Sequence, residues 1–423
     1  MCPAFSRTVM RILLAIHNAY TDSTSGAAHS MRILMQWLLQ GGHDCRVLAT
    51  ARFDARPPAS IDAHLAELGV PIHRSPPSKA FVRSVHKPAN MQVGRPTVDF
   101  ALNGIPVTML FTKAPPGSTA DRLEGEQFLF LLDAMLRELE PDVLLTYGGH
   151  PIVQEAMRHA RQHGVTTVFT LRNRGYEERR WFEHVDRVFT TSPFLSRHYH
   201  DAIGLHSAGI DSPIDWSEVE APDETRRFVT FVNPTIHKGA MLFARLADLI
   251  GSRRPDIPML VVQSAASAGA LNAIPGFDFR KYPQIMAAPA TPRPSDFFAL
   301  TRLLIVPSVF PEPFGRVAAE ALINGIPPLV SDRGALPETV RGAGRVLPLP
   351  AWMTEDSREI PSETEAVPWF QAICELWDDP AAYEAAARMA RQTARQHYSE
   401  AVLRGRYLEY FAAIDSVEPL FAG

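Results

Sequence analysis

The sequence predicts an α/β protein made of two doubly wound domains, each with a parallel sheet covered by helices on both faces. Three observations support this fold class. Short apolar runs alternate with segments of helical periodicity along most of the 423 residues, which is typical of buried parallel sheets. The same rhythm starts again near residue 226, after a stretch at 205–225 rich in Ser, Pro and acidic residues that indicates a linker. At about 150 residues per domain, the length corresponds to two or three domains.

In the first half, six apolar runs bounded by turn signals predict strands. These runs are 11–17, 45–50, 107–111, 143–146, 167–171 and 187–191, and helical periodicity falls near 27–41, 123–139 and 151–163. Residues 54–121 differ, because they contain ten prolines and little periodicity. We therefore expect long functional loops there.

The second half repeats the pattern. Its predicted strands are 228–233, 259–263, 303–307 and 328–331, and its predicted helices lie near 240–253, 315–324, 365–376, 380–397 and 399–411. The sequence thus divides into an N-terminal domain at 1–205, a C-terminal domain at 206–398, and a closing segment at 399–423. We expect this segment to be a helix that packs back on the N-terminal domain, and a ligand to bind in a cleft between the domains.

Composition limits the class of protein. A net charge of −4 provides no basic field for nucleic acid, and the three cysteines form neither a disulfide framework nor a CxxC metal pair. No apolar run approaches the roughly 18 to 20 residues that span a bilayer, and the first nine residues lack the apolar core of a signal peptide. We therefore expect a cytoplasmic protein with no nucleic-acid partner and no transmembrane segment, while peripheral membrane contact stays open.

The most specific stretch is 307–338. A buried strand ends there, a polar loop carries Glu312, and a helix that begins near Gly315 carries Glu320. The unpaired N–H groups and dipole of a helix start favour a phosphate, and glycine lets a ligand approach the backbone. The two carboxylates can accept hydrogen bonds from sugar or ribose hydroxyls. Two solvated surface glutamates are the alternative, but the combined context favours a binding site.

This stretch resembles the signature of glycosyltransferase family 4, retaining enzymes of the GT-B fold that use nucleotide-sugar donors. Residues 307–327 match P-S-x-x-E-x-F-G-x-x-x-x-E-A-x-x-x-G-x-P with one extra loop residue. The resemblance implies two Rossmann-like domains, a catalytic Glu312 that contacts the transferred sugar, and a Glu320 that holds the ribose hydroxyls. It also implies donor binding by the amides around Phe314, Gly315 and Arg316.

A second match surrounds Lys238, one of only five lysines beside 37 arginines, in Lys238-Gly239 at a predicted strand-to-helix turn. Family members also place an Arg five residues earlier, and both cations neutralise the donor diphosphate. Asn233 stands at that position here, which removes one positive charge. The resemblance implies that Lys238, alone or with Arg316, stabilises the leaving diphosphate, and that Asn233 lies in the donor site. A surface lysine that merely starts a helix is the alternative.

The turn at 17–29 resembles the family's N-terminal Gly-rich loop, which implies that Ser25 and Gly26 lie against the donor phosphates and the acceptor. It lacks the GxGxxG pattern, so a nicotinamide or flavin enzyme is disfavoured, and no GxxxxGK[ST] occurs. We expect residues that pair with the nucleotide base in the loops at 264–296.

Two further predicted strand ends carry polar residues. His150 follows one of them and either touches the sugar or acceptor or caps the next helix. After the other, Arg172 stands where the family commonly has a His. A basic cluster there either receives an acidic acceptor group or forms a solvated face. Its members are Arg172, Asn173, Arg174, Arg179 and Arg180.

We therefore predict a retaining glycosyltransferase that moves a sugar from a nucleoside diphosphate sugar to an acceptor hydroxyl. We expect no cofactor and no metal, because no Asp-x-Asp motif is present and the resemblance requires none. The N-terminal domain and its Pro-rich loops are expected to bind the acceptor, and the C-terminal domain the donor. A non-catalytic nucleotide-sugar-binding protein is the alternative. A sugar-nucleotide epimerase or a phosphorylase on the same fold ranks lower.

Overall fold

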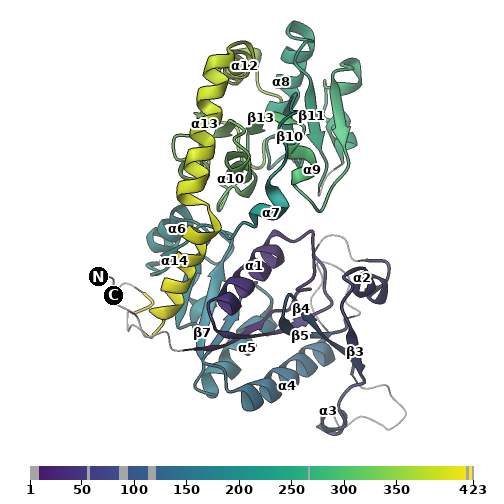
Figure 1. The fold of residues 1–423 in the computed structure, drawn as a ribbon, viewed down its shortest axis with the longest axis vertical. Coiled ribbons are helices and arrows are strands. Elements are labelled where there is room, and N and C mark those ends of the chain that lie inside the picture. Colours follow the sequence, from purple (N-terminus) through teal and green to yellow (C-terminus); the bar gives the residue numbers. More distant parts are fainter. Residues whose placement is uncertain are drawn as a thin grey trace. The chain divides into compact units, whose positions relative to one another are not determined.

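The computed structural model describes residues 9–54, 58–84, 94–112, 121–264, 267–415 and 419–421. The chain forms two units. Unit 1 is Met1–Pro213 together with Arg404–Gly423, and unit 2 is Ile214–Leu403. Each unit is built on its own sheet, of nine strands in unit 1 and six in unit 2 (Figure 1).

The sheet of unit 1 is parallel except at one edge. Its strands are β1 (Arg11–Ala15), β2 (Asp44–Thr50), β3 (Ile72–Ser75), β4 (Thr97–Leu102), β5 (Ile105–Leu110), β6 (Val143–Thr146), β7 (Thr166–Leu171), β8 (Arg187–Thr190) and β9 (Ala208–Gly209). Their order is β3-β4-β5-β2-β1-β6-β7-β8-β9. The order reverses direction between β1 and β6, and ligands in open α/β sheets bind beyond the carboxyl ends of the strands at such a switch point.

Helices cover both faces of this sheet. They are α1 (Gly26–Gln40), α2 (Ile61–Glu67), α3 (Lys79–Ser84), α4 (Arg122–Leu139), α5 (Pro151–Gln162), α6 (Pro193–Ile203) and most of α14 (Glu400–Ala412), with a short 3₁₀ helix at Arg179–Phe182. Leu13 and Leu144 point to one face and pack with Phe128 of α4 and Met157 of α5. The helix α1 lies on the opposite face (Figure 1). Burial on both faces explains why these strands are continuous apolar runs.

The prediction of loops over 54–121 is wrong for most of the described part of that range. It contains α2, α3, β3 and β4, and β3 and β4 pair antiparallel at the edge of the sheet. Three of the four residues of β3 are exposed, so the strand has no apolar alternation that a sequence pattern would reveal. Residues 55–57, 85–93 and 113–120 lie outside the described residues.

The sheet of unit 2 is entirely parallel. Its strands are β10 (Phe228–Val232), β11 (Met259–Val262), β12 (Ile285–Ala288), β13 (Thr301–Val306), β14 (Pro328–Ser331) and β15 (Arg345–Leu347). Their order is β12-β11-β10-β13-β14-β15, with parallel pairing throughout. The switch point of this sheet therefore lies between β10 and β13.

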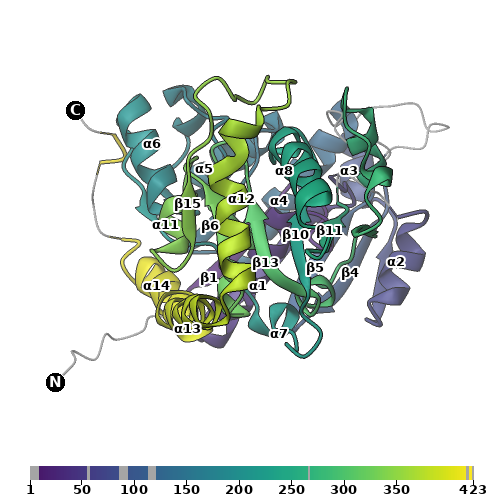
Figure 2. The ribbon, with the colours of Figure 1, turned by 90° about the horizontal axis from the view of Figure 1, so that it is seen from above.

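The helices of unit 2 bury alternate residues of these strands. They are α7 (Trp216–Val219), α8 (Ala240–Arg253), α9 (Ser295–Phe298), α10 (Arg316–Ile323), α11 (Leu336–Val340), α12 (Glu363–Asp378) and α13 (Pro380–His397), with 3₁₀ turns at Ala268–Ala273 and Phe279–Lys281. Leu303 and Ile305 pack against α8 and α12, which lie side by side (Figure 2). Leu304 and Val306 pack in the other cluster, with α10 and α13. Successive residues of a strand point to opposite faces, which produces this division.

The C-terminal helix α14 packs within unit 1. The ring of Tyr407 lies 6.1 Å from that of Trp37 on α1 and 5.6 Å from that of Phe189 on β8. Nε of Arg187 donates a hydrogen bond of 3.1 Å to the carbonyl oxygen of Ile414 just beyond the helix. Across the described ranges, no helix has the length and apolarity needed to cross a membrane.

Candidate functional site

Two loops meet at the switch point of unit 2. One follows β10 and carries Lys238, and the other follows β13 and carries Glu312. The strands are direct neighbours in the sheet. The backbone N–H groups of Val309 and Phe310 both donate to the carbonyl oxygen of His237, at 3.1 and 3.2 Å. The two stretches that the sequence singled out are therefore fixed against each other.

An ion pair connects the two loops. Nζ of Lys238 donates a hydrogen bond of 2.6 Å to Oε1 of Glu312, which also accepts one of 2.7 Å from the hydroxyl of Ser308. The Glu312 side chain is 8% exposed and that of Lys238 34%. The carboxylate is thus held by two donors, while the ammonium group stays open to a ligand.

A second ion pair lies on α10. Nε of Arg316 donates a hydrogen bond of 2.7 Å to Oε1 of Glu320, one helical turn further on. Burial raises the pKa of Glu320 above its ordinary value, and the neighbouring Arg316 charge opposes that rise. The two glutamates of the motif therefore each have a separate cation, and both are buried.

Glycines begin the two helices at this site. Gly239 precedes α8 and Gly315 precedes α10, with φ of +89° and +81°, and neither helix start has a side-chain cap. A Cβ on Gly315 would lie 2.5 Å from Cδ2 of Leu336, and one on Gly239 would overlap the carbonyl oxygen of Pro307. Only glycine fits these turns, and the helix N-termini that they open favour an anion.

Phe314 and Asn233 are placed differently from each other. The Phe314 ring is buried in the core against Tyr398, 5.9 Å between centroids, so only its backbone can contact a ligand. Asn233 follows β10 with φ of +61°. Among the residues that the structure describes, its buried Oδ1 has no hydrogen-bond partner. An amide oxygen there can accept a hydrogen bond but cannot replace the positive charge of an arginine.

Ser25 and Gly26 lie at the start of α1 in unit 1. Oγ of Ser25 caps this helix by accepting from the N–H of Ala28 at 3.3 Å. The carbonyl oxygen of Gly26 accepts a hydrogen bond of 3.5 Å from Nη2 of Arg172, and a Cβ on Gly26 would meet nothing within 4 Å. The space beside this turn suits a ligand, and the contacts of Ser25 and Gly26 with donor phosphates stay a prediction.

His150 caps α5, since its Nδ1 accepts from the N–H of Ile152 at 3.3 Å. Its ring also stacks on His17, with centroids 4.4 Å apart and planes inclined by 28°. Burial, and then the nearby charges of His17 and Arg52, lower the pKa of His150 to about 4. His150 is therefore neutral at pH 7 and lies at the switch point of unit 1.

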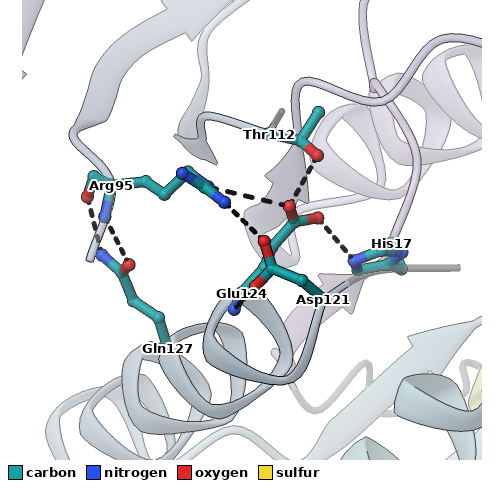
Figure 3. Close-up of polar contacts among 6 residues, drawn as sticks. All are labelled: His17, Arg95, Thr112, Asp121, Glu124 and Gln127. Carbon is teal, nitrogen blue, oxygen red and sulfur yellow. Dashed lines mark hydrogen bonds and ion pairs between the residues drawn. The ribbon is translucent and has the colours of Figure 1, made fainter. Parts of the chain in front are cut away.

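A buried carboxylate supports His17. Glu124 on α4 is fully buried, and its Oε1 lies 3.2 Å from Nε2 of His17 (Figure 3). Its Oε2 accepts a hydrogen bond of 2.6 Å from Thr112 and lies 3.9 Å from Nε of Arg95. Burial alone would raise the pKa of Glu124, but the hydrogen bonds from His17 and Thr112 lower it below its ordinary value. Glu124 is thus a fixed negative charge beneath His17.

The predicted basic cluster after β7 is divided between different partners. Arg179 donates to the carbonyl oxygen of Ile203 and stacks over Phe421, whereas Arg180 pairs with Glu178. These two arginines have partners within the protein, so we leave them out of the site. Three candidates remain near the end of β7: Arg172, Asn173, whose side chain accepts from the N–H of Gly175, and Arg174.

Sequence reasoning missed two charged residues near the switch point of unit 1, namely Arg52 beyond β2 and Glu124 on α4. Arg52 is one of 37 arginines, and Glu124 lies in the first turn of a helix, where acidic residues are common. Neither residue stands out by type or spacing. Of the loops expected to contact the nucleotide base, residues 265–266 lie outside the described residues. In the described part of the chain, no group of three or more His, Cys, Asp or Glu residues could hold a metal ion.

No protein-family model matches the sequence, and no curated protein matches it. Solved structures do match. A glycosyltransferase from Rickettsia africae ESF-5 has a TM-score of 0.64 at 13% identity, over 97% of this chain and 100% of that one. HepE from Anabaena in complex with UDP and glucose has a TM-score of 0.63 at 14% identity, over 96% of this chain and 100% of that one. The pneumococcal O-GlcNAc transferase GtfA in complex with UDP and GlcNAc has a TM-score of 0.63 at 12% identity, over 96% of this chain and 100% of that one. At these identities the likeness establishes the fold, and the chain has the GT-B fold.

Proposed function

We propose that the protein is a retaining glycosyltransferase, similar to family 4, that transfers a sugar from a nucleoside diphosphate sugar to an acceptor hydroxyl without a metal. The observation that carries this proposal is the 2.6 Å contact between Lys238 and Glu312 at the switch point of unit 2. Two motifs that resemble the family's donor-binding motifs meet there, on a fold shared with glycosyltransferases solved with UDP and a sugar.

Each group of this site has a proposed role. The N-termini of α8 and α10, opened by Gly239 and Gly315, bind the diphosphate through backbone N–H groups. Lys238 stabilises the negative charge that grows on the diphosphate as the bond from the sugar breaks. Glu312 supports the transferred sugar and orients Lys238, and Glu320 accepts from the ribose hydroxyls.

The reaction needs no protein nucleophile in this proposal. The bond between the anomeric carbon and the diphosphate oxygen breaks, and the acceptor oxygen forms its bond on the same face of the sugar. The acceptor proton goes to the departing phosphate oxygen. Retention of configuration follows, because both events occur on one face.

The direct test is a panel of UDP-, GDP-, ADP- and dTDP-sugars, with released nucleotide measured with and without candidate acceptors. We expect release with one base, and we expect this release to survive chelation of divalent metals. The NMR coupling of the anomeric proton in the product reports whether configuration is retained. Release that requires a divalent metal, or a product of inverted configuration, would remove the corresponding part of the proposal.

A non-catalytic nucleotide-sugar-binding protein is the second candidate. Two departures favour it: Asn233 stands where the family has an Arg, and Arg172 where it commonly has a His. This candidate predicts that a nucleotide protects the protein against thermal unfolding while no sugar in the panel is turned over or hydrolysed.

A further inference from the structure

We infer that unit 1 contains an anion site at its own switch point, in which Arg52 binds a phosphate or carboxylate group of the acceptor. The assignment of this anion to an acceptor rests on the proposed function. The site itself rests on the side chains of unit 1 alone.

Arg52 is a buried cation, and one nitrogen of its guanidinium lacks a hydrogen-bond partner among the described residues. It lies two residues beyond β2 and is only 8% exposed. Within the described ranges of the chain, its buried Nη1 has no hydrogen-bond partner. An unpaired buried charge is costly, so a group of this kind indicates a ligand that the free protein lacks.

The nearby acidic residues are already engaged. Asp22 accepts from the N–H and hydroxyl of Thr24 and from the N–H of Asp54. Asp54 in turn accepts a hydrogen bond of 2.6 Å from Nδ2 of Asn18. Glu124 has Oε1 within 3.2 Å of His17, while its Oε2 accepts from Thr112 and lies 3.9 Å from Arg95 (Figure 3).

The residues of unit 1 outside the described ranges offer little to pair with Arg52. In sequence they contain a single acidic side chain, that of Glu418, near the C-terminus. The positive charge of Arg52 is therefore available to a ligand.

The backbone holds Arg52 beside the switch point. The N–H of Ala19, two residues after His17, donates a hydrogen bond of 2.7 Å to the carbonyl oxygen of Arg52. His17 in turn stacks on His150, so the ends of β2, β1 and β6, three neighbouring strands, meet here. The carboxyl ends of these strands are where a ligand is expected in such a sheet.

Other groups at these strand ends also favour an oxyanion. His150 begins α5, a helix of twelve residues, whose N-terminus favours negative charge. The hydroxyl of Tyr147, which follows β6, is buried and has no hydrogen-bond partner among the described residues. The guanidinium and the hydroxyl can donate to the oxygens of a phosphate or a carboxylate, and the dipole of α5 adds a favourable field.

Thermal unfolding of the full chain tests this site, with inorganic phosphate and acetate as probes. The variant is Arg52→Met, which keeps the volume and removes the charge. Arg46→Met is the matched control, because Arg46 lies on β2, the strand that precedes Arg52, and has a half-exposed side chain. We expect phosphate or acetate to raise the unfolding midpoint of the wild type and of Arg46→Met by the same amount. The rise should be clearly smaller in Arg52→Met, which retains only the proposed diphosphate site of unit 2.

Without any anion, we expect Arg52→Met to unfold about 2–4 °C above the wild type, because an unpaired charge has been removed. If Arg52 only stabilised the fold, Arg52→Met would instead unfold at a lower temperature than the wild type. A lower midpoint together with anion protection as large in Arg52→Met as in the wild type would overturn the proposal, and so would a wild type that neither anion protects.

UDP, GDP, ADP and dTDP complete the experiment. The nucleotide that protects the wild type should protect Arg52→Met equally, and loss of that protection would assign Arg52 to the donor and overturn the acceptor assignment. If no nucleotide protects any variant while phosphate still does, the proposed function fails and the anion site stands.

Discussion

Nζ of Lys238 lies 2.6 Å from Oε1 of Glu312, although 74 positions separate the two residues in sequence. The pair joins the loop after β10 to the loop after β13. Each residue limits what the other can do: Glu312 holds the lysine in place, and Lys238 compensates for the burial of the carboxylate.

Lys238→Ala should lower kcat by about 10²–10³, because a charge that stabilises the departing diphosphate is lost. Released nucleotide from the best donor of the panel measures this rate. Lys281→Ala is the control, since Lys281 is another of the five lysines of the chain and is exposed in unit 2. Equal rates for wild type and Lys238→Ala would separate this lysine from the chemistry.

The glycines at the helix starts should differ in their tolerance of a methyl group. Gly239→Ala should destabilise the protein by more than about 3 kcal/mol, because its Cβ would overlap the backbone oxygen of Pro307. Gly315→Ala should cost less, since the side chain of Leu336 can move. Gly164→Ala should cost only about 1–2 kcal/mol, because that residue has φ of +74° but nothing within 4 Å. Chemical denaturation measures the loss of stability in each variant. A small loss for Gly239→Ala would contradict the predicted overlap of its Cβ with the oxygen of Pro307.

Glu320→Gln should stabilise the protein without donor and weaken its binding of donor. Burial raises the folded-state pKa of Glu320, so the folded protein holds this proton more tightly than the unfolded chain. Wild-type stability therefore falls as pH rises from the ordinary pKa of 4.5 through the folded pKa, and the advantage of Gln grows over the same window and then levels off. Unfolding midpoints across pH measure the difference.

The matched control for this change is Glu384→Gln, an exposed position on α13. It should leave both the unfolding midpoint and the donor KM unchanged. A Glu320→Gln protein that is less stable than the wild type at every pH would show that the Arg316 pair outweighs burial.

Glu124→Gln should destabilise unit 1 by about 3–5 kcal/mol, because Arg95 and His17 lose a fully buried partner. The pKa of Glu124 is lowered in the folded state, so its contribution is present above the ordinary pKa of 4.5 and is lost as pH falls through the folded pKa. The stability deficit of the variant should therefore shrink in acid. Denaturant unfolding at pH 7 and in acid measures both effects.

Glu126→Gln provides the comparison on the same helix. Glu126 pairs with Arg122 on the surface, where a single ion pair contributes at most about 1 kcal/mol. If Glu124→Gln and Glu126→Gln lowered the free energy of unfolding by similar amounts, the polar network of Figure 3 would not stabilise unit 1.

The regular parts of the fold could be predicted because their signals are local. The apolar runs at 143–146 and 328–331 coincide with β6 and β14, and the helix expected at 240–253 coincides with α8. The elements that were missed have weaker patterns. The strand β3 is mostly exposed at a sheet edge, and β15 has only three residues, none of them fully buried. Short or exposed strands need no apolar alternation, so periodicity does not reveal them.

The candidate site divides in the same way. Lys238, Glu312, Gly315 and Glu320 were found because each stands within a short motif whose spacing is visible in sequence. Arg52 became a candidate only when the structure showed a buried guanidinium without a partner among the described residues. No pattern in the chain marks it among 37 arginines.

The sequence by itself determined the doubly wound α/β class, the restart near residue 226 and the positions of the motifs around Lys238 and Glu312, because strand periodicity and helix-start chemistry are set by neighbouring residues. Tertiary structure alone decided which distant side chains meet. The order of strands brought Lys238 to Glu312 in unit 2, and His17 to His150 and Glu124 in unit 1. Such pairings depend on the order of strands in the sheet. Burial in turn shifts the pKa of residues such as Glu320 and His150, because it depends on which elements cover them. Neither the strand order nor the covering elements are contained in a local stretch of sequence.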